Sequence, residues 1–243
     1  MTRVAMFGRC LAIQGAWNYE SLLGNGIGFC IEPALRRLPG GVHSPAFKDA
    51  LARESRYFNA HPYLASVAVG ALARAELDGE PAERIERFRT ALCGPLGSVG
   101  DRLVWAGWLP FSSLTALALF GFGGTPFGVV ATFLIVYNVG HLGLRLWGLN
   151  TGWSHGLRVA TALGNPVLRR GPEQIGRLAA LATGFGIPLA LDRVIGPGRN
   201  LIGIVLLVVI LGALVIVRLQ GRIEGWRLSL VVLAAFVLLS VIR

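Results

Sequence analysis

Two polar side chains stand just before a proline and an apolar stretch, in the run Phe58-Asn59-Ala60-His61-Pro62-Tyr63. Proline is favoured in the first turn of a helix, so this run predicts a helix start, where backbone N–H groups are unpaired and partially positive. Asn59 and His61 add donors and acceptors of the kind that hold sugar hydroxyls. A helix cap with an interfacial histidine explains the same residues, and the spacing leaves both interpretations open.

A carboxylate, Asp101, stands at the start of a long apolar run with Arg102 beside it. A charge at the entrance to a membrane segment is costly unless it is paired or hydrated. Asp101 is therefore either an interface anchor paired with Arg102, or a group that binds a hydroxyl or ties two membrane segments together. An intramembrane aspartyl protease is disfavoured, because Ser98 replaces the first glycine of its Gly-x-Gly-Asp motif and the other candidate, Asp192, stands beside Arg193.

The other reactive residue types lack the spacing of a catalytic or metal site. His141 follows Asn138 by three residues, which places both on one helix face, and helix packing explains that pair as well as a transport path does. The sequence shows no metal-ligand spacing, no phosphate-binding glycine loop and no Ser/His/Asp set. We therefore expect no enzymatic activity of the chain by itself, no cofactor and no metal. The three cysteines are expected to act as small buried hydrophobes: Cys10, Cys30 and Cys93.

The elements that position these residues are predicted to be membrane helices. Of 243 residues, 53% are apolar and only 15% are charged, against about 25% charged in a soluble domain. A spanning helix needs roughly 20 apolar residues. Five apolar segments follow residue 102, of which the first, second and fourth are long enough and the fifth is marginal: Leu103–Gly121, Thr125–Leu144, Leu178–Leu191, Leu201–Val217 and Leu228–Ile242. The third is short and contains two glycines and a proline, which indicates a tilted or broken helix.

The net charge of +10 does not indicate nucleic-acid binding, because the arginines lie between the apolar segments, where cytoplasmic loops of membrane proteins carry them. If residues 1–102 are cytoplasmic and the five segments alternate, eight later arginines lie inside and three outside. The sequence thus predicts an all-α, multi-pass protein of the lipid bilayer with a cytoplasmic N-terminus and an external C-terminus.

The first half, 1–102, is predicted to be a cytoplasm-facing region and 103–243 the transmembrane region. Residues 4–35 mix aromatic and apolar side chains with glycines and charges, as amphipathic interfacial helices do, and residues 36–56 look like a solvated connector. A short charged helix is expected from near Pro81. Two apolar pieces, Pro62–Ala73 and Ala91–Val99, are too short to span, so we expect re-entrant helices.

Three motifs occur in order along this first half. The first runs from Gln14-Gly15-Ala16-Trp17-Asn18-Tyr19-Glu20 through Gly28-Phe29 to Pro33-Ala34-Leu35. The second is Phe58–Tyr63. The third is Gly94-Pro95-Leu96-Gly97-Ser98-Val99-Gly100-Asp101, with Trp105 four residues later. Their form and order resemble the IID membrane subunit of the mannose/fructose/sorbose class of the phosphoenolpyruvate-dependent sugar phosphotransferase system (PTS).

The resemblance implies a transporter subunit without a phosphorylated residue of its own. It implies assembly with a IIC membrane subunit in a higher homo-oligomer of the IIC–IID pair, in the inner (cytoplasmic) membrane of a bacterial cell. The pair carries a hexose inward, and the cytoplasmic IIA and IIB units relay phosphate to it. The candidate residues for substrate binding or the subunit interface are then Asn18, Glu20, Asn59, His61 and Asp101. A non-transporting scaffold or sensor derived from the same family is the alternative.

Two departures from the family pattern bear on that alternative. Arg102 stands where the family often has serine or proline, and Leu109 stands where an arginine is common. The missing arginine at position 109 and the extra one at position 102 are either a compensated swap within one ion pair or the mark of a divergent, regulatory member.

Overall fold

The computed structural model describes residues 2–159, 164, 166–195 and 211, and the regular elements among them are all helices, with two isolated backbone bridges. The chain divides into two compact units, Met1–Leu189 and Ala190–Arg243. Only a few residues of the second unit are described, so the architecture below is that of the first unit.

Short helices build the N-terminal part around one buried helix. They are α1 (Thr2–Cys10), α2 (Gly24–Leu35), η1 (Gly41–His43), α3 (Pro45–Glu54) and the buried α4 (Ala65–Leu77). Helix α3 corrects the expectation of a solvated connector over 36–56. Its N-cap Ser44 accepts a hydrogen bond from the Phe47 N–H at 3.1 Å, and Phe47 and Ala50 are buried. The sequence interpretation missed this helix because its residues are mostly small or charged, and only Phe47, Ala50 and Leu51 pack apolar side chains on the core.

Helix α4 lies in the centre of the N-terminal part, and 11 of its 13 residues are buried. A helix that is hydrophobic on all sides needs partners on all sides, and α4 packs against α2, α5 and α7. Its contact with α7 is backbone to backbone. A Cβ built at Gly70 would lie 2.3 Å from the Leu149 carbonyl oxygen, and one built at Gly152 would lie 2.1 Å from that of Val67.

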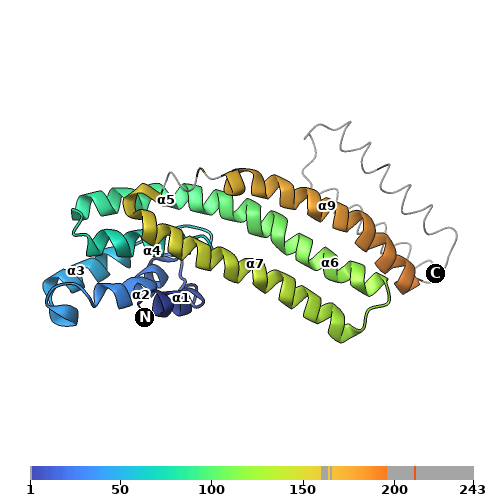
Figure 1. The fold of residues 1–243 in the computed structure, drawn as a ribbon, viewed down its shortest axis with the longest axis horizontal. Helices are drawn as coiled ribbons and strands as arrows, with labels where there is room; N and C mark the ends of the chain where they lie inside the picture. The colour runs from blue at the N-terminus through green and yellow to red at the C-terminus, as the bar shows by residue number, and fades with distance from the viewer. Residues whose placement is uncertain (1, 160–163, 165, 196–210, 212–243) are drawn as a thin grey trace. The chain divides into compact units, whose positions relative to one another are not determined.

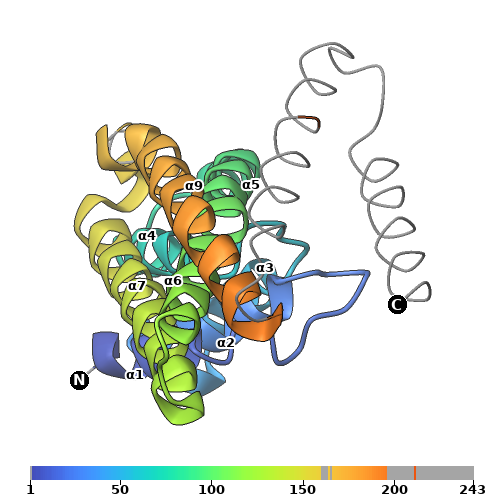
Figure 2. The same ribbon diagram turned by 90° about the vertical axis from the view of Figure 1, so that its right-hand side faces the viewer.

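Three long helices follow (Figure 1). The first is continuous from Ala82 to Gly121 and consists of α5 (Ala82–Gly100), the π-helix η2 (Asp101–Trp108) and α6 (Leu109–Gly121). A turn with Gly123 at φ 95° leads to α7 (Pro126–His155), followed by η3 (Gly156–Arg158) and α9 (Pro166–Ile195). The two views show α6 and α7 side by side, with α1 and α4 against the C-terminal half of α7 (Figures 1 and 2).

Three helices among the described residues are long and apolar enough to cross a membrane: Ala82–Gly121, Pro126–Arg158 and Leu168–Val194. They contain the first three predicted spans. The third is not broken, because α9 continues through Pro188, and a Cβ built at Gly186 would lie 2.9 Å from the Leu114 carbonyl oxygen of α6. The glycine therefore serves close packing. The last two predicted spans, Leu201–Val217 and Leu228–Ile242, lie outside the described residues.

The two short apolar segments form different structures. Pro62–Ala73 leads into and forms most of α4, whereas Ala91–Val99 is the middle of the continuous helix that begins at Ala82. The charged helix expected from near Pro81 is therefore the start of that long helix. The division at residue 102 falls inside it as well. That α4 dips into the membrane stays a prediction.

Candidate functional site

Two of the three sequence motifs form opposite walls of one cleft of about 520 Å³. One wall is the segment Tyr57–Pro62, which contains Asn59 and His61. The other is α5 and the start of η2, with Gly97, Ser98, Asp101 and Trp105 among its lining residues. The structure thus brings together Asn59, His61 and Asp101, three of the five candidate residues.

The remaining candidates, Asn18 and Glu20, lie outside the cleft, in the loop between α1 and α2. The Asn18 side-chain oxygen accepts hydrogen bonds from the backbone N–H groups of Glu20 and Ser21 at 3.0 and 2.8 Å, so Asn18 shapes the loop. The Ser21 carbonyl oxygen in turn accepts a hydrogen bond from the Phe58 N–H at 3.1 Å. Asn18 is therefore connected to the cleft wall through Ser21 and Phe58, the residue before Asn59, and the Glu20 side chain is exposed.

His61 is buried in the wall of the cleft, with 1% of its surface exposed. Its Nδ1 accepts a hydrogen bond from the Tyr63 N–H at 3.2 Å, and the Trp105 ring centroid lies 4.9 Å away. Burial, and then the nearby Arg145 charge, lower the pKa of His61 from 6.5 to about 4. The imidazole is therefore neutral at pH 7, and its Nε2 is buried without a hydrogen-bond partner among the described residues.

A glycine on the opposite wall makes room for this histidine. A Cβ built at Gly100 would lie 2.2 Å from the His61 Cβ, a distance at which side chain and backbone cannot coexist. The glycine immediately before Asp101 is thus required by the close approach of the two motifs.

Asp101 and Asn59 are exposed side chains at this cleft. The Arg102 guanidinium donates its Nε–H to the Ser98 carbonyl oxygen at 3.2 Å, and Asp101 takes part in none of the ion pairs found among the described residues. The pairing of Asp101 with Arg102 is therefore absent from this structure. The carboxylate remains available to a hydroxyl or to a donor on another chain.

Sequence reasoning missed a buried arginine behind the cleft. Arg145 is one of the eight later arginines that the sequence analysis places inside, between apolar segments, but it belongs to α7 and is 2% exposed. Its guanidinium lies 4.6 Å from the centroid of the Tyr63 ring and donates a hydrogen bond to the Cys10 carbonyl oxygen at the C-terminal end of α1, where a positive charge is favoured. The sequence contained one indication that Arg145 belongs to a helix with polar neighbours: His141 and Arg145 are four residues apart and share a helix face.

The groups at the cleft suit hydrogen bonding to a polar ligand or to a partner chain. Asn59 offers an amide, Asp101 a carboxylate and Ser98 a hydroxyl, and the rings of Tyr57 and Trp105 are 55% and 42% exposed. No group of three or more His, Cys, Asp or Glu side chains that could hold a metal ion occurs within the described part of the chain.

Comparison with known proteins decides the family. The model of the PTS system mannose/fructose/sorbose family IID component matches residues 1–184. The chain belongs to this IID family. The mannose-specific EIID component of Escherichia coli K12 is 31% identical over 204 residues, which cover 78% of this chain and 70% of the relative. The sorbose-specific EIID component of Klebsiella pneumoniae is 27% identical, with 79% and 74% covered.

Solved structures agree with this assignment. A cryo-EM structure of the mannose transporter ManYZ with microcin E492 contains a chain that is 28% identical, at a TM-score of 0.59, with 75% of this chain and 68% of that chain covered. A second structure, of a membrane protein, matches at 26% identity and a TM-score of 0.64, with the same coverage. This IID chain thus shares its fold with a subunit of a membrane transporter complex.

Proposed function

We propose that this IID chain acts with a IIC membrane subunit to move a hexose inward across the bacterial cytoplasmic membrane, for phosphorylation by the IIB unit, which IIA supplies with phosphate. The observation that carries the proposal is the cleft at which Phe58–Tyr63 and Gly94–Asp101 meet, since the two motifs by which the chain resembles IID subunits form a single site. A higher oligomer of the IIC–IID pair is part of the proposal.

We assign the cleft to subunit contact and gating rather than to covalent chemistry. The support is that Asp101 and Asn59 are exposed there, while His61 is a neutral packing residue whose Nε2 is buried. A charged or polar group exposed in a single subunit becomes stabilising when a partner supplies its hydrogen bond. Asn18 and Glu20 belong to this proposal through the loop that holds Phe58.

Reconstitution with IIC tests the proposal. In a complex of IIC, tagged IID and phosphorylated IIB, Asp101→Asn and Asn59→Ala should each lower hexose uptake or recovery of IIC on the IID tag about tenfold, the effect of losing roughly 1.4 kcal/mol of hydrogen bonding. Glu83→Gln is the matched control, because Glu83 is an exposed carboxylate in the first turn of the same helix. Assembly without any hexose uptake by the unaltered complex would favour the scaffold alternative.

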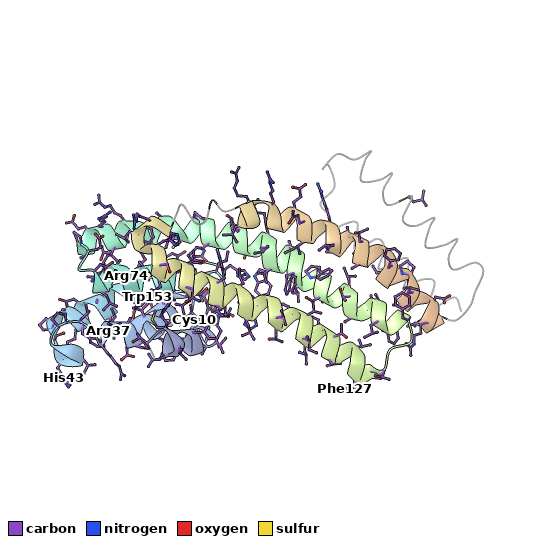
Figure 3. All side chains as sticks on the ribbon, in the orientation of Figure 1. Cys10, Arg37, His43, Arg74, Phe127 and Trp153 are labelled. Carbon is purple, nitrogen blue, oxygen red and sulfur yellow. The ribbon has the colours of Figure 1, made fainter. Side chains whose placement is uncertain are left out.

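Labelling of single cysteines tests the proposed orientation. Asn150 and Phe127 lie towards opposite ends of α7 and are both exposed, and Figure 3 shows Phe127 at the far end of α7 from Trp153. With a cytoplasmic N-terminus, an Asn150→Cys chain should react with an impermeant reagent only from the cytoplasmic side, and a Phe127→Cys chain only from outside. The reverse pattern would overturn the orientation.

A further inference from the structure

A second buried arginine, Arg89 on α5, fastens the loop that forms one wall of the cleft. It is 6% exposed. Its Nη1–H donates to the Tyr57 carbonyl oxygen at 2.9 Å, and its Nη2 donates to the carbonyl oxygens of Glu54 and Arg56 at 3.0 and 2.5 Å. The guanidinium also lies 5.2 Å from the centroid of the Phe58 ring. One side chain thus contacts four of the five residues that run from the end of α3 to Phe58.

The carbonyl groups at the end of α3 need such a partner. The last carbonyls of a helix have no partner within the helix, and basic side chains commonly satisfy them. Arg89 supplies this bond to Glu54, the last residue of α3, and continues to the loop beyond it. Because the next residue after Phe58 is Asn59, the position of the second motif, Phe58–Tyr63, depends on this clamp.

The same helix face carries the other wall of the cleft. Cys93, Gly97 and Asp101 follow Arg89 at intervals of four residues, and all three line the cleft. Residues four apart lie on one face of a helix, so the clamp and the third motif, Gly94–Asp101, share a rigid element. Arg89 therefore joins the two walls at one end of the cleft.

We propose that Arg89 is the positioning residue of the motif cleft: it holds Tyr57–Pro62 against α5 and thereby sets the separation between Asn59 and Asp101. This inference rests on the proposed function for its biological meaning, but its geometry is measurable without transport. A lysine does not replace the arginine, since a single ammonium group lacks the planar fork that reaches several carbonyl oxygens at once.

The carboxyl group of Glu54 is not part of the clamp that Arg89 forms. It lies 3.2 Å from the Arg89 Nε, both of its oxygens lack hydrogen bonds, and burial raises its pKa to about 8 against the opposing effect of Arg89. The clamp itself uses the backbone carbonyl of Glu54. Glu54→Gln therefore replaces the carboxyl group with an amide of the same shape and leaves the three carbonyl contacts in place, which makes it the matched control for substitutions of Arg89.

A disulfide between the two walls reports their separation. A Cβ built at Gly97 would lie 4.0 Å from the Ala60 Cα, which keeps the two Cα atoms within the range of about 4.4–6.8 Å that a disulfide bridges. In the full chain with Cys93→Ala, the pair Ala60→Cys and Gly97→Cys should oxidise readily, and the bridge is identified by mass spectrometry of proteolytic fragments. The rate of its formation is the measurement.

A second pair controls for general unfolding. A Cβ built at Gly107 would lie 3.5 Å from the Ile175 Cβ, so Gly107→Cys with Ile175→Cys should form a bridge between η2 and α9, away from Arg89. We expect Arg89→Met and Arg89→Lys to slow the 60–97 bridge at least fivefold while the 107–175 bridge forms at the parental rate. Glu54→Gln should leave both rates unchanged.

The outcomes separate the inference from the proposed function. An unchanged 60–97 rate in Arg89→Met would overturn the inference, and so would an equal loss of both bridges, which would show that Arg89 only stabilises the fold. Absence of hexose uptake by the unaltered IIC–IID complex would overturn the proposed function and leave the bridge rates as they are.

Discussion

Replacing Gly152 of α7 by alanine tests the central contact of the fold, the crossing of α4 and α7. A Cβ at Gly152 would lie 2.1 Å from the Val67 carbonyl oxygen and 2.8 Å from the Ala71 backbone nitrogen. Both neighbours are backbone atoms of α4, so rotation of a side chain cannot relieve the clash. The two helices must separate by about 1 Å to restore an ordinary contact.

The same helix provides a matched control. A Cβ at Gly143 would meet no atom within 4 Å, and Gly143→Ala makes the same chemical change within α7. Alanine is favoured over glycine inside a helix by roughly 0.5–1 kcal/mol, and this gain cancels when the two variants are compared. The difference between them is the steric cost alone, about 1–3 kcal/mol by analogy with other overpacked cores.

Unfolding in detergent measures this difference. The loss of helical circular dichroism with temperature gives a midpoint for each variant, and 1 kcal/mol corresponds to about 2–4 °C for a chain of this size. We expect Gly152→Ala to melt several degrees below Gly143→Ala. Equal midpoints would refute the backbone contact between α4 and α7, and with it the enclosed position of α4.

Three further predictions concern the cleft and the helix ends. Because the pKa of His61 is about 4 when folded and 6.5 when free, the unfolded chain binds the extra proton between these values, so the His61 contribution to stability is full above pH 6.5 and falls by up to about 3 kcal/mol as the pH drops towards 4. The buried Glu54, whose pKa is raised to about 8, acts in the opposite direction over the same window, so the effect of His61 is measured as the difference between the melting curves of His61→Gln and of the unaltered chain at each pH. Gly100→Ala should destabilise the chain more than Gly94→Ala, since only the Cβ at Gly100 meets His61; equal melting points would contradict the packing of the two motifs. Thr125→Ala should lower the free energy of unfolding by about 1 kcal/mol, because the Thr125 Oγ1 accepts a hydrogen bond from the Gly128 N–H at 3.1 Å, while Thr125→Ser should retain the cap.

Local features were readable from the sequence because their causes are local. The lengths of the apolar segments identify the helices that begin the membrane region, since the cost of exposing backbone polar groups to lipid depends on segment length and composition. The proline at 81 marked the start of α5. The motifs around His61 and Asp101 were recognisable as residue patterns, and the family they indicate was confirmed.

Only the tertiary structure decided which polar groups are buried and which segments meet. Hydropathy assigns the same apolar character to a helix that faces lipid and to one enclosed by protein, so it did not reveal that other helices of the same chain pack around α4 or that Ala91–Val99 continues a longer helix. From the sequence alone an arginine is assigned to a loop, because its long-range partners are not visible there. Arg89 donates to the Tyr57 carbonyl oxygen and Arg145 to that of Cys10, which lie 32 and 135 residues away along the chain. The cleft depends on such distant contacts, because the energy that positions Asn59 opposite Asp101 comes from side chains that are separated in sequence and adjacent only in the folded chain.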